Sequence, residues 1–370
     1  MNNLPKNFCI IPWISTETTA LGNVKPCCIY YNKITDENGQ PFHLSKNTMS
    51  EAFNSEYMND LRQQFLDGKR PGGCHQCWGE EDSGKATKRI RDNQRFKHLI
   101  TESIIHGKQN PRYLDIKLGN ICNLKCVMCS ANASSKIAAE AKQHYGFPQG
   151  WSGGDKAELE PFTPDTRNDY FTELQQIIDT IPKFNLVGGE NLIHPDFPRL
   201  FQMFIDSPNV GNIDMLIITN GTIVPDIVQD NALLFKSIAI LISMDGVFER
   251  GSYVRSGLNW KKFDTNVRKF ASNPHVFLRL VPAIQMLNVG YVKEMHEWVE
   301  SVGLDAKMNI DWNNVVTYPE TLRAINLPQE IKQQYMRKMI GPDVTHPSIR
   351  VVFNILKQPQ YSHCLLYTSP

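Results

Sequence analysis

The pattern of apolar and polar positions changes near residue 111. Beyond it, short apolar runs alternate with segments in which apolar residues recur every three or four positions. The runs predict β-strands and the periodic segments predict amphipathic helices. The predicted strands lie near residues 112–118, 183–188, 213–219, 237–243, 276–284 and 306–312. The clearest predicted helices between them cover residues 196–206, 260–271 and 292–302. Such alternation is typical of a parallel α/β sheet, and six units are too few for an eight-stranded barrel.

The rest of the chain divides into further parts. Residues 1–95 are rich in turns and contain five cysteines, with one helix predicted over 51–66. Residues 96–110 are predicted to be a linker before a strand–helix domain over 111–316. Within that domain, an insertion over 144–165 has the irregular composition of a lid or binding loop. The C-terminal segment, 317–370, ends in Cys-Leu-Leu-Tyr-Thr-Ser-Pro, which resembles translated sequencing-adapter read-through. That resemblance implies that the native C-terminus is missing, and a genuine frayed tail is the alternative.

Composition and charge exclude several classes of protein. The chain has 370 residues, of which 41% are hydrophobic, and its net charge of +1 gives no signal for nucleic-acid binding. We expect no secretion signal and no membrane span, because no basic start precedes an apolar run and no uncharged apolar stretch is long enough. Eight of the nine cysteines fall in two groups. In a reducing compartment such groups indicate metal sites, so we expect a cytoplasmic protein.

Three cysteines follow the first strand of the strand–helix domain. Cys122, Cys126 and Cys129 have the spacing C-x3-C-x2-C and lie on the loop between strand 112–118 and a helix predicted over 130–141. A structural zinc site or a ferredoxin cluster needs four protein ligands, whereas three thiolates can hold three irons of a [4Fe–4S] cluster and leave the fourth iron to a small molecule. The loop after a strand is where α/β barrels place their chemistry. A zinc knuckle or a group of buried thiols is the alternative.

This motif and its strand–loop–helix context resemble the signature of the radical S-adenosylmethionine (radical SAM) superfamily. The resemblance implies an α/β fold, a partial (β/α)6 barrel with a small irregular, cysteine-rich metal-binding domain before it. It also implies that S-adenosylmethionine (SAM) chelates the open iron, and that one electron from the reduced cluster splits SAM into methionine and a 5′-deoxyadenosyl radical. Met128 stands where the family often has an aromatic residue whose backbone binds the adenine, and Met keeps an apolar wall there without ring stacking.

Further motifs at the strand ends match the order of the family's SAM-binding segments. The second, third and fourth strands end in Gly-Gly-Glu, Thr-Asn-Gly and Ser-Met-Asp-Gly, and an arginine follows the last. The resemblance implies that SAM is bound by Gly188, Gly189, Glu190, Thr219, Asn220, Ser243 and Arg255. In this scheme Glu190 meets the methionyl ammonium and Arg255 neutralises the carboxylate. Tight turns and a solvated arginine are the alternatives. Gln285 and Asn288, after the fifth strand, flank the adenosine in relatives or only form a turn.

The N-terminal cysteines form a second candidate metal site. A C-x2-C pair lies on a Gly- and Pro-rich turn, and two ligands come from earlier in the chain. The predicted ligands are Cys9, Cys27, Cys74 and Cys77, and Cys28 is the alternative to Cys27 because spacing cannot order adjacent residues. The pattern resembles the auxiliary-cluster modules called SPASM and twitch. It implies one second [4Fe–4S] cluster, since a full SPASM module has cysteines for two. Four thiolates also suit zinc, which is the alternative.

Two classes of function are compatible with the sequence. The resemblance implies a radical SAM enzyme that abstracts hydrogen from a substrate, and relatives with auxiliary modules modify peptides, proteins and a few small molecules. The expected partners are an electron donor such as flavodoxin or ferredoxin and a peptide or small-molecule substrate, with no nucleic acid and no membrane. The alternative is a non-catalytic iron–sulfur or zinc-binding electron-transfer protein on the same scaffold. The complete Gly-Gly-Glu motif, Ser243 and Arg255 favour the enzyme.

Overall fold

The computed structural model describes residues 4–84, 86–107, 111–145, 162, 167, 169–339 and 349–359. Most of the predicted insertion over 144–165 lies outside the described residues, as does the tail that contains Cys364. Among the described residues, no helix combines the length and the apolar character that crossing a lipid bilayer requires.

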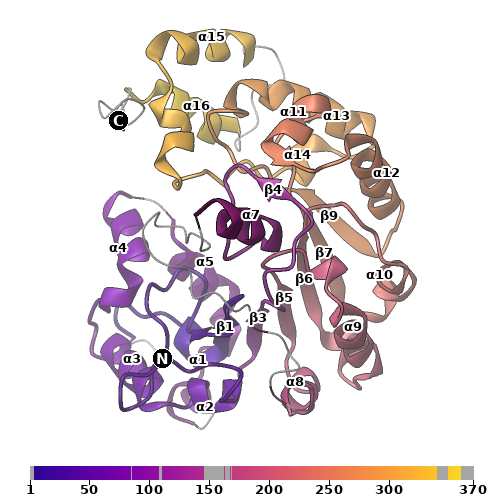
Figure 1. The fold of residues 1–370 in the computed structure, drawn as a ribbon. Coiled ribbons are helices and arrows are strands. Elements are labelled where there is room, and N and C mark those ends of the chain that lie inside the picture. The colour runs from indigo at the N-terminus through magenta and orange to yellow at the C-terminus, as the bar shows by residue number, and fades with distance from the viewer. Residues whose placement is uncertain are drawn as a thin grey trace.

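A parallel sheet lies at the centre of the molecule (Figure 1). Within the described ranges it has seven strands in the order β2-β1-β3-β5-β6-β7-β9. Their bounds are β1 Ser15–Thr18, β2 Val24–Lys25, β3 Tyr113–Ile116, β5 Lys183–Leu186, β6 Asp214–Thr219, β7 Ser237–Ile242 and β9 Val276–Leu280. Only β2 runs antiparallel to its neighbour, and all other paired strands of this sheet are parallel. The parallel α/β architecture predicted from the sequence is therefore confirmed.

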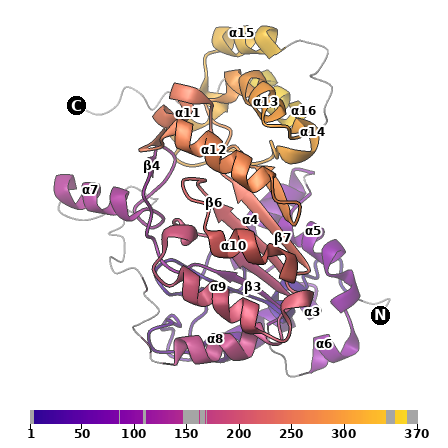
Figure 2. The ribbon, with the colours of Figure 1, turned by 90° about the vertical axis from the view of Figure 1, so that its right-hand side faces the viewer.

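The two faces of the sheet are covered differently, because successive side chains of a strand point to opposite sides. One face is apolar and fully buried, as Leu114, Phe184, Ile217 and Ile240 show. Helices on one side of the sheet cover it (Figures 1 and 2). These helices are α8 Tyr170–Ile178, α9 Phe197–Asp206, α10 Asp226–Asn231 and α12 Trp260–Ala271. The opposite face, called the lumen face below, carries Asp115, Asn185, Leu216, Ala239 and Leu241. Most of its side chains are only half-buried, so this face is available for a site.

The N-terminal region joins the sheet. Strand β1 pairs in parallel with β3, so one strand of the predicted 1–95 domain extends the sheet of the strand–helix domain. The other N-terminal elements are short helices: α1 Ile11–Ile14, α2 Met49–Phe53, α3 Glu56–Leu66, η1 Gly72–Cys74, α4 His75–Asp82, α5 Lys88–Arg95, η2 Lys97–Leu99 and α6 Glu102–His106. They lie together below the C-terminal helices in Figure 1. The N-terminal cysteines are thus held against the edge of the barrel sheet.

The remaining described elements lie outside the seven-stranded sheet. A two-residue ladder joins β4 Lys125–Cys126 to β8 Arg255–Ser256. The helices are α7 Ser135–Tyr145, α11 Phe248–Val254, α13 Val292–Ser301, α14 Ala306–Asn309, α15 Gln329–Met339 and α16 Ile349–Lys357. The short 3-10 turns are η4 Asn191–Ile193, η5 Val210–Asn212, η6 Ala232–Leu234, η7 Val289–Tyr291, η8 Glu320–Leu322 and η9 Ala324–Asn326.

Three sequence-based boundaries were wrong. The sixth strand, predicted over 306–312, is helix α14 followed by an isolated bridge between Ile310 and Leu280. The Asp305 side chain accepts from the Lys307 backbone N–H and so begins that helix. The helix predicted over 130–141 begins at Ser135, since Ser134 accepts from the N–H of Ile137. The helix predicted over 51–66 is two helices, α2 and α3, because Ser55 caps the second one.

Candidate functional site

The three-cysteine loop leaves the carboxyl end of β3 and is fixed by side chains at both ends. Asn120 Nδ2 donates to the carbonyl oxygen of Ala131 at 3.0 Å, which closes the loop. Ser134 Oγ donates to the carbonyl oxygen of Leu124 at 2.7 Å. Such side-chain bonds replace regular structure over a segment that is neither helix nor long strand. The backbone of the loop is therefore positioned by the protein itself.

The three thiols lie close enough to interact electrostatically. Cys126 is buried, and Cys122 and Cys129 are half-buried. Burial and the neighbouring thiols Cys126 and Cys122 together raise the pKa of Cys129 to about 12, although Arg255 opposes the rise. Burial likewise raises the pKa values of Cys122 and Cys126, and Arg255 opposes the rise in both. Thiolates here need a strong positive charge beside them, and a bound metal supplies one.

Arg255 is the cation nearest to this group of thiols. The β4–β8 ladder places Arg255 opposite Cys126. The guanidinium is buried, and its Nη1 lies 2.6 Å from Asp245 Oδ2. Asp245 in turn accepts from the N–H of Ala283 at 2.6 Å. Arg255 Nε is buried without a hydrogen-bond partner, so the guanidinium keeps a donor for a further group.

Asp245 is the aspartate of the Ser-Met-Asp-Gly motif, and the sequence-based prediction assigned it no role. It is fully buried and positions Arg255, which is why it matters to the site. A carboxylate directly after a buried strand, within reach of a later arginine, is the signal that could have identified it.

Glu190 links the second and third strand ends. Its Oε1 accepts from Thr219 Oγ1 at 2.8 Å and from the Leu192 N–H at 3.2 Å. Its Oε2 accepts from the Asn220 N–H at 2.5 Å. Burial raises the pKa of Glu190, and these hydrogen bonds lower it again. Asn220 Nδ2 lies 3.9 Å from Cys122 Sγ, so the predicted SAM-binding residues and the cysteine loop form one connected network.

The two glycines of the Gly-Gly-Glu motif allow a close approach of backbone to backbone. A Cβ atom on Gly189 would lie 2.4 Å from the carbonyl oxygen of Ile121, in the cysteine loop. Gly188 has a φ of +101°, and a Cβ there would lie 2.9 Å from Lys117 Cγ. Side chains at either position would push the motif away from the loop. The glycines therefore allow Glu190 to lie next to the cysteine loop.

The other predicted cofactor residues lie around the same strand ends. Met128 is half-buried and packs against the hydrophobic core. Ser243 is half-buried, and its N–H donates to the carbonyl oxygen of Thr219 at 2.9 Å. Asn288 is a turn residue whose Oδ1 accepts from the Gln285 N–H at 2.8 Å. Both polar side-chain atoms of Gln285 are buried without a partner, which is typical of a residue that binds a ligand.

The N-terminal thiols come from three separate segments. Cys9 precedes α1, Cys27 follows β2, and Cys74 and Cys77 lie at the junction of η1 and α4. Burial raises the pKa of Cys9, and the thiols that interact with it are those of Cys27, Cys74 and Cys77. Burial also raises the pKa of Cys74 to about 12. Four thiols from distant parts of the chain are thus brought into one group.

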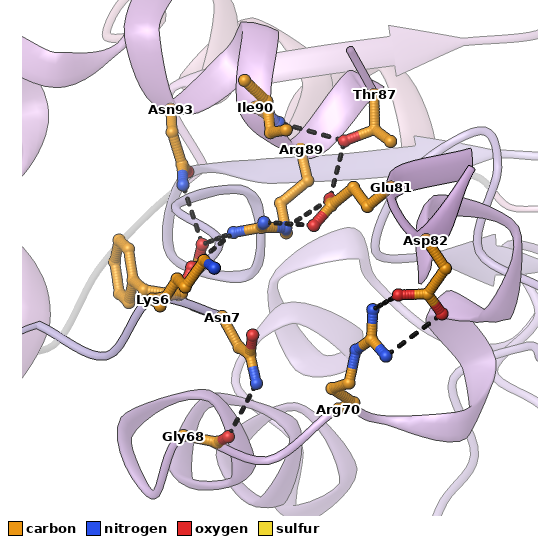
Figure 3. Close-up of polar contacts among 11 residues, drawn as sticks. Lys6, Asn7, Gly68, Arg70, Glu81, Asp82, Thr87, Arg89, Ile90 and Asn93 are labelled. Atoms are coloured by element: carbon orange, nitrogen blue, oxygen red, sulfur yellow. Dashed lines mark hydrogen bonds and ion pairs between the residues drawn. The ribbon is translucent and has the colours of Figure 1, made fainter. Parts of the chain in front are cut away.

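Helix α5 fixes the backbone on both sides of Cys9. Asn93 Nδ2 donates to the carbonyl oxygen of Phe8 at 2.7 Å, and its Oδ1 accepts from the Ile10 N–H at 2.8 Å. Figure 3 shows Asn93 beside Arg89 at this point. Arg89 Nη1 also donates to the Phe8 carbonyl oxygen, at 2.7 Å.

The same arginine connects Cys9 to the helix that carries Cys77. Arg89 Nη2 and Nε bind the two carboxylate oxygens of Glu81 at 2.5 and 2.8 Å, a bidentate pair (Figure 3). Thr87 Oγ1 donates to Glu81 at 2.8 Å. Because planar bidentate pairs fix geometry, Arg89 holds the two segments at a set distance.

Cys28 lies in a different environment from Cys27. The charged groups near Cys28 are Lys88, Glu17, Asp115 and Lys117, and it is the most exposed of the described N-terminal cysteines. Cys27 interacts with Cys28 and Lys88 as well, and in addition with the thiols of Cys74 and Cys9.

Both cysteine groups have the donor chemistry of iron–sulfur sites. The first offers three thiols beside one cation, and the second offers four thiols. Within the described part of the chain, no three His, Cys, Asp or Glu side chains converge closely enough to share one metal ion. A cubane does not require such convergence, because each thiolate binds a different iron. The residues therefore fit clusters of this kind.

Comparison with protein families identifies the chain. A model of the radical SAM superfamily matches residues 116–298, a range that contains the three-cysteine loop. The chain belongs to the radical SAM superfamily. A model of the SPASM iron–sulfur cluster-binding domain matches residues 9–78, so the chain carries a SPASM-type module before its radical SAM domain. The cofactors expected from the sequence, a [4Fe–4S] cluster with SAM and auxiliary iron–sulfur chemistry, are those of the matched families. No curated protein matches the chain.

Several solved structures are similar to this chain. The anSMEcpe structure with bound AdoMet covers 52% of this chain and 48% of its own, at 16% identity and a TM-score of 0.37. The match to Streptococcus suis SuiB bound to S-adenosylmethionine covers 90% of this chain and 67% of the SuiB chain, at 13% sequence identity and a TM-score of 0.39. The match to SuiB bound to precursor peptide SuiA covers 74% of this chain and 58% of the SuiB chain, at 12% sequence identity and a TM-score of 0.38. The chain spans about half the length of the anSMEcpe chain that it matches.

Proposed function

We propose that this chain cleaves SAM reductively at a [4Fe–4S] cluster and abstracts hydrogen from a peptide or protein side chain. The observation that carries the proposal is the connected network of the cysteine loop, Glu190, Asn220 and Arg255. Three thiols hold three irons, and the donors and acceptors around them suit the two charges of an amino acid. The SPASM match supports a peptide or protein as substrate, because such modules accompany enzymes that modify them.

Each residue of the network has a separate role in this proposal. Cys122, Cys126 and Cys129 would hold the cluster, which supplies the electron that splits the carbon–sulfur bond of SAM. Glu190 would accept from the methionyl ammonium, while Thr219 and the Asn220 N–H keep its carboxylate oriented.

Arg255 would bind the methionyl carboxylate with the donors that Asp245 leaves free. The ion pair with Asp245 keeps the guanidinium in place, so little side-chain freedom is lost on binding. Ser243 and Gly188 would line the ribose and methionyl region. Met128 would cover the adenine, and the orphaned amide of Gln285 would bind its edge.

The N-terminal group would hold an auxiliary cluster through Cys9, Cys27, Cys74 and Cys77. It would accept an electron from the substrate or bind the substrate directly. The proposed domains are an auxiliary module over 1–95, a linker over 96–110, the radical core over 111–316 and a C-terminal segment over 317–370. A flavodoxin or ferredoxin would supply the reducing electron.

One experiment separates this function from its alternative. The protein is reconstituted with iron and sulfide without oxygen and is incubated with SAM and dithionite. Formation of 5′-deoxyadenosine and methionine in equal amounts is expected. A protein that takes up iron but forms neither product would instead be an electron-transfer or metal-binding protein, and the proposal would fail.

A further inference from the structure

A row of polar side chains crosses the lumen face at the end of the sheet nearest to the N-terminal module. Glu17 on β1 is in register with Asp115 on β3, and Asp115 is in register with Asn185 on β5. Residues in register across a parallel sheet have their side chains on the same face. The next two positions in the same register are Leu216 and Ala239, so the polar part of the row ends at Asn185. These three residues are called the polar row below.

One lysine binds both carboxylates of the polar row. Lys117 Nζ forms an ion pair with Glu17 Oε1 and lies 3.5 Å from Asp115 Oδ1. It also donates to the carbonyl oxygen of Thr18 at 3.2 Å. Lys88 lies 2.7 Å from Asp92 and also lowers the pKa of Asp115. Lys25 on β2 is the register partner of Glu17. The two carboxylates share the ammonium of Lys117 as their ion-pair partner.

Two members of the polar row have an oxygen without a hydrogen-bond donor. Glu17 Oε2 and Asn185 Oδ1 are buried and unpartnered, whereas Asp115 Oδ1 has its 3.5 Å ion pair with Lys117. The side chains of Glu17 and Asp115 are only 4% and 9% exposed. Asn185 Nδ2 is already used, since it donates to Tyr113 Oη at 2.6 Å. Buried acceptors are normally satisfied, so two orphaned acceptors beside a long ion pair point to a ligand that brings several donors.

The polar row lies between the two cysteine groups. The aliphatic stem of Lys117 packs on Gly188, the first glycine of the Gly-Gly-Glu motif. On the other side, Cys28 interacts electrostatically with Glu17 and Asp115, and its neighbour in the chain is Cys27. A ligand bound to the row would therefore extend between the SAM-binding strand ends and the auxiliary cysteines. That is where a substrate must lie if both sites act on it.

We propose that Glu17, Asp115 and Asn185 form the subsite that anchors a cationic group of the substrate, an ammonium or a guanidinium. The inference rests on the proposed function and adds the chemical class of the substrate. A guanidinium carries five N–H donors in a plane and suits several acceptors at once. Two carboxylates in the subsite disfavour an anion, and a charged donor makes a stronger hydrogen bond to a carboxylate than a neutral donor does.

The ionisation of Asp115 agrees with this assignment. Burial raises its pKa, Lys117 lowers it, and the charge of Glu17 raises it again. A cation in contact with Asp115 would stabilise the ionised form.

The test compares three small probes on the reconstituted full chain with SAM bound. The probes are n-butylguanidinium, its neutral isostere n-butylurea and the anion butyrate, and ligand-observed NMR measures their binding. The guanidinium is expected to bind at least tenfold more tightly than the urea, and butyrate to show no binding. Equal binding of guanidinium and urea, tighter binding of butyrate, or no binding of the guanidinium would overturn the proposal. This comparison uses only the unaltered chain, so misfolding of a variant cannot obscure it.

Two shape-conserving variants then locate the subsite. Glu17→Gln and Asp115→Asn should each weaken guanidinium binding about tenfold, which corresponds to about 1.4 kcal/mol. The matched control is Asp214→Asn, which removes a half-exposed carboxylate from the start of β6 and should leave binding unchanged. Equal losses in all three variants would place the cation elsewhere. A chain that forms deoxyadenosine without binding the guanidinium would refute this inference alone, and one that binds it without forming deoxyadenosine would refute the proposed function alone.

Discussion

The two cysteine groups of this chain are built in different ways. The barrel group takes three thiols from one loop of eight residues, and polar side chains from three other strand ends surround it. The N-terminal group takes four thiols from three segments up to 68 positions apart, Cys9 to Cys77, and its surroundings are backbone and fixed ion pairs.

The difference indicates what each group can do. A local loop with three donors leaves one iron of a cubane to an outside ligand. Arg255 and Glu190 next to it carry the charges that would complement the carboxylate and the ammonium of an amino acid. Four donors complete a cluster, and the Arg89–Glu81 pair near them is saturated by protein groups. In the proposed function, the first group therefore binds and cleaves SAM, and the second transfers electrons or has a structural role.

The largest effect is expected from removing one thiol of the barrel group. In Cys126→Ala the cluster loses one of its three protein ligands, so deoxyadenosine formation should fall to the level without protein. The matched control is Val127→Ala, an exposed neighbour in the same loop, which should keep its activity. Chromatography of reaction mixtures measures the product, and retained SAM cleavage in Cys126→Ala would refute the assignment.

The next prediction tests whether the N-terminal group holds iron by itself. The reconstituted chain should contain about eight irons, and a triple alanine variant at Cys122, Cys126 and Cys129 should keep about four, because each cubane has four. Iron analysis and Mössbauer spectroscopy measure this. One zinc and no iron in the triple variant would show that the N-terminal group is a zinc site and would refute the second cluster.

The third prediction concerns the ion pairs around the N-terminal group. Glu81→Ala leaves the buried Arg89 without its partner and should lower the free energy of unfolding by about 3–5 kcal/mol. Asp82→Ala is the matched control, since its pair with Arg70 is exposed and its loss should leave the free energy of unfolding nearly unchanged (Figure 3). Urea denaturation of both variants measures the difference. Equal losses would contradict the positioning role of Arg89.

The fourth prediction concerns the charges of the barrel site. Glu190→Ala or Arg255→Ala should each weaken SAM binding by about 1–3 kcal/mol, the range for hydrogen bonds to charged groups. Calorimetry on reconstituted protein measures the affinity. A suitable control is Glu249→Ala, an exposed carboxylate in α11, for which no change is expected. Unchanged affinity in both site variants would exclude the proposed SAM contacts.

The local features of this molecule could be predicted from the sequence, and the non-local ones could not. Five predicted strands coincide with β3, β5, β6, β7 and β9, because each run is apolar on the side that the helices bury. The sixth failed because the N-cap of Asp305 outweighed the short apolar run. The pairing of β1 with β3 joins residues about a hundred positions apart, and no local pattern encodes it.

The same limit applies to the candidate sites. The spacing of Cys122, Cys126 and Cys129 is sufficient to indicate their chemistry, since one loop carries all three. The polar row was overlooked, although Asp115 and Lys117 stand at alternate positions of a buried strand. Charges at that spacing indicate a polar lumen face, but their partner Glu17 comes from a strand that only the three-dimensional structure places beside them.

The smallest effect is expected at Cys28. Its charged neighbours are Lys88, Glu17, Asp115 and Lys117, whereas Cys27 interacts with the thiols of Cys9 and Cys74. In the triple alanine background, Cys28→Ala should therefore keep about four irons, and Cys27→Ala should keep fewer, because three thiolates leave the fourth iron without a protein ligand. Each variant is the control for the other, since both remove one thiol from the same turn. The reverse result would make Cys28 the ligand. Equal retention would mean that either thiol can complete the cluster, and the N-terminal group would then be less rigid than the barrel group.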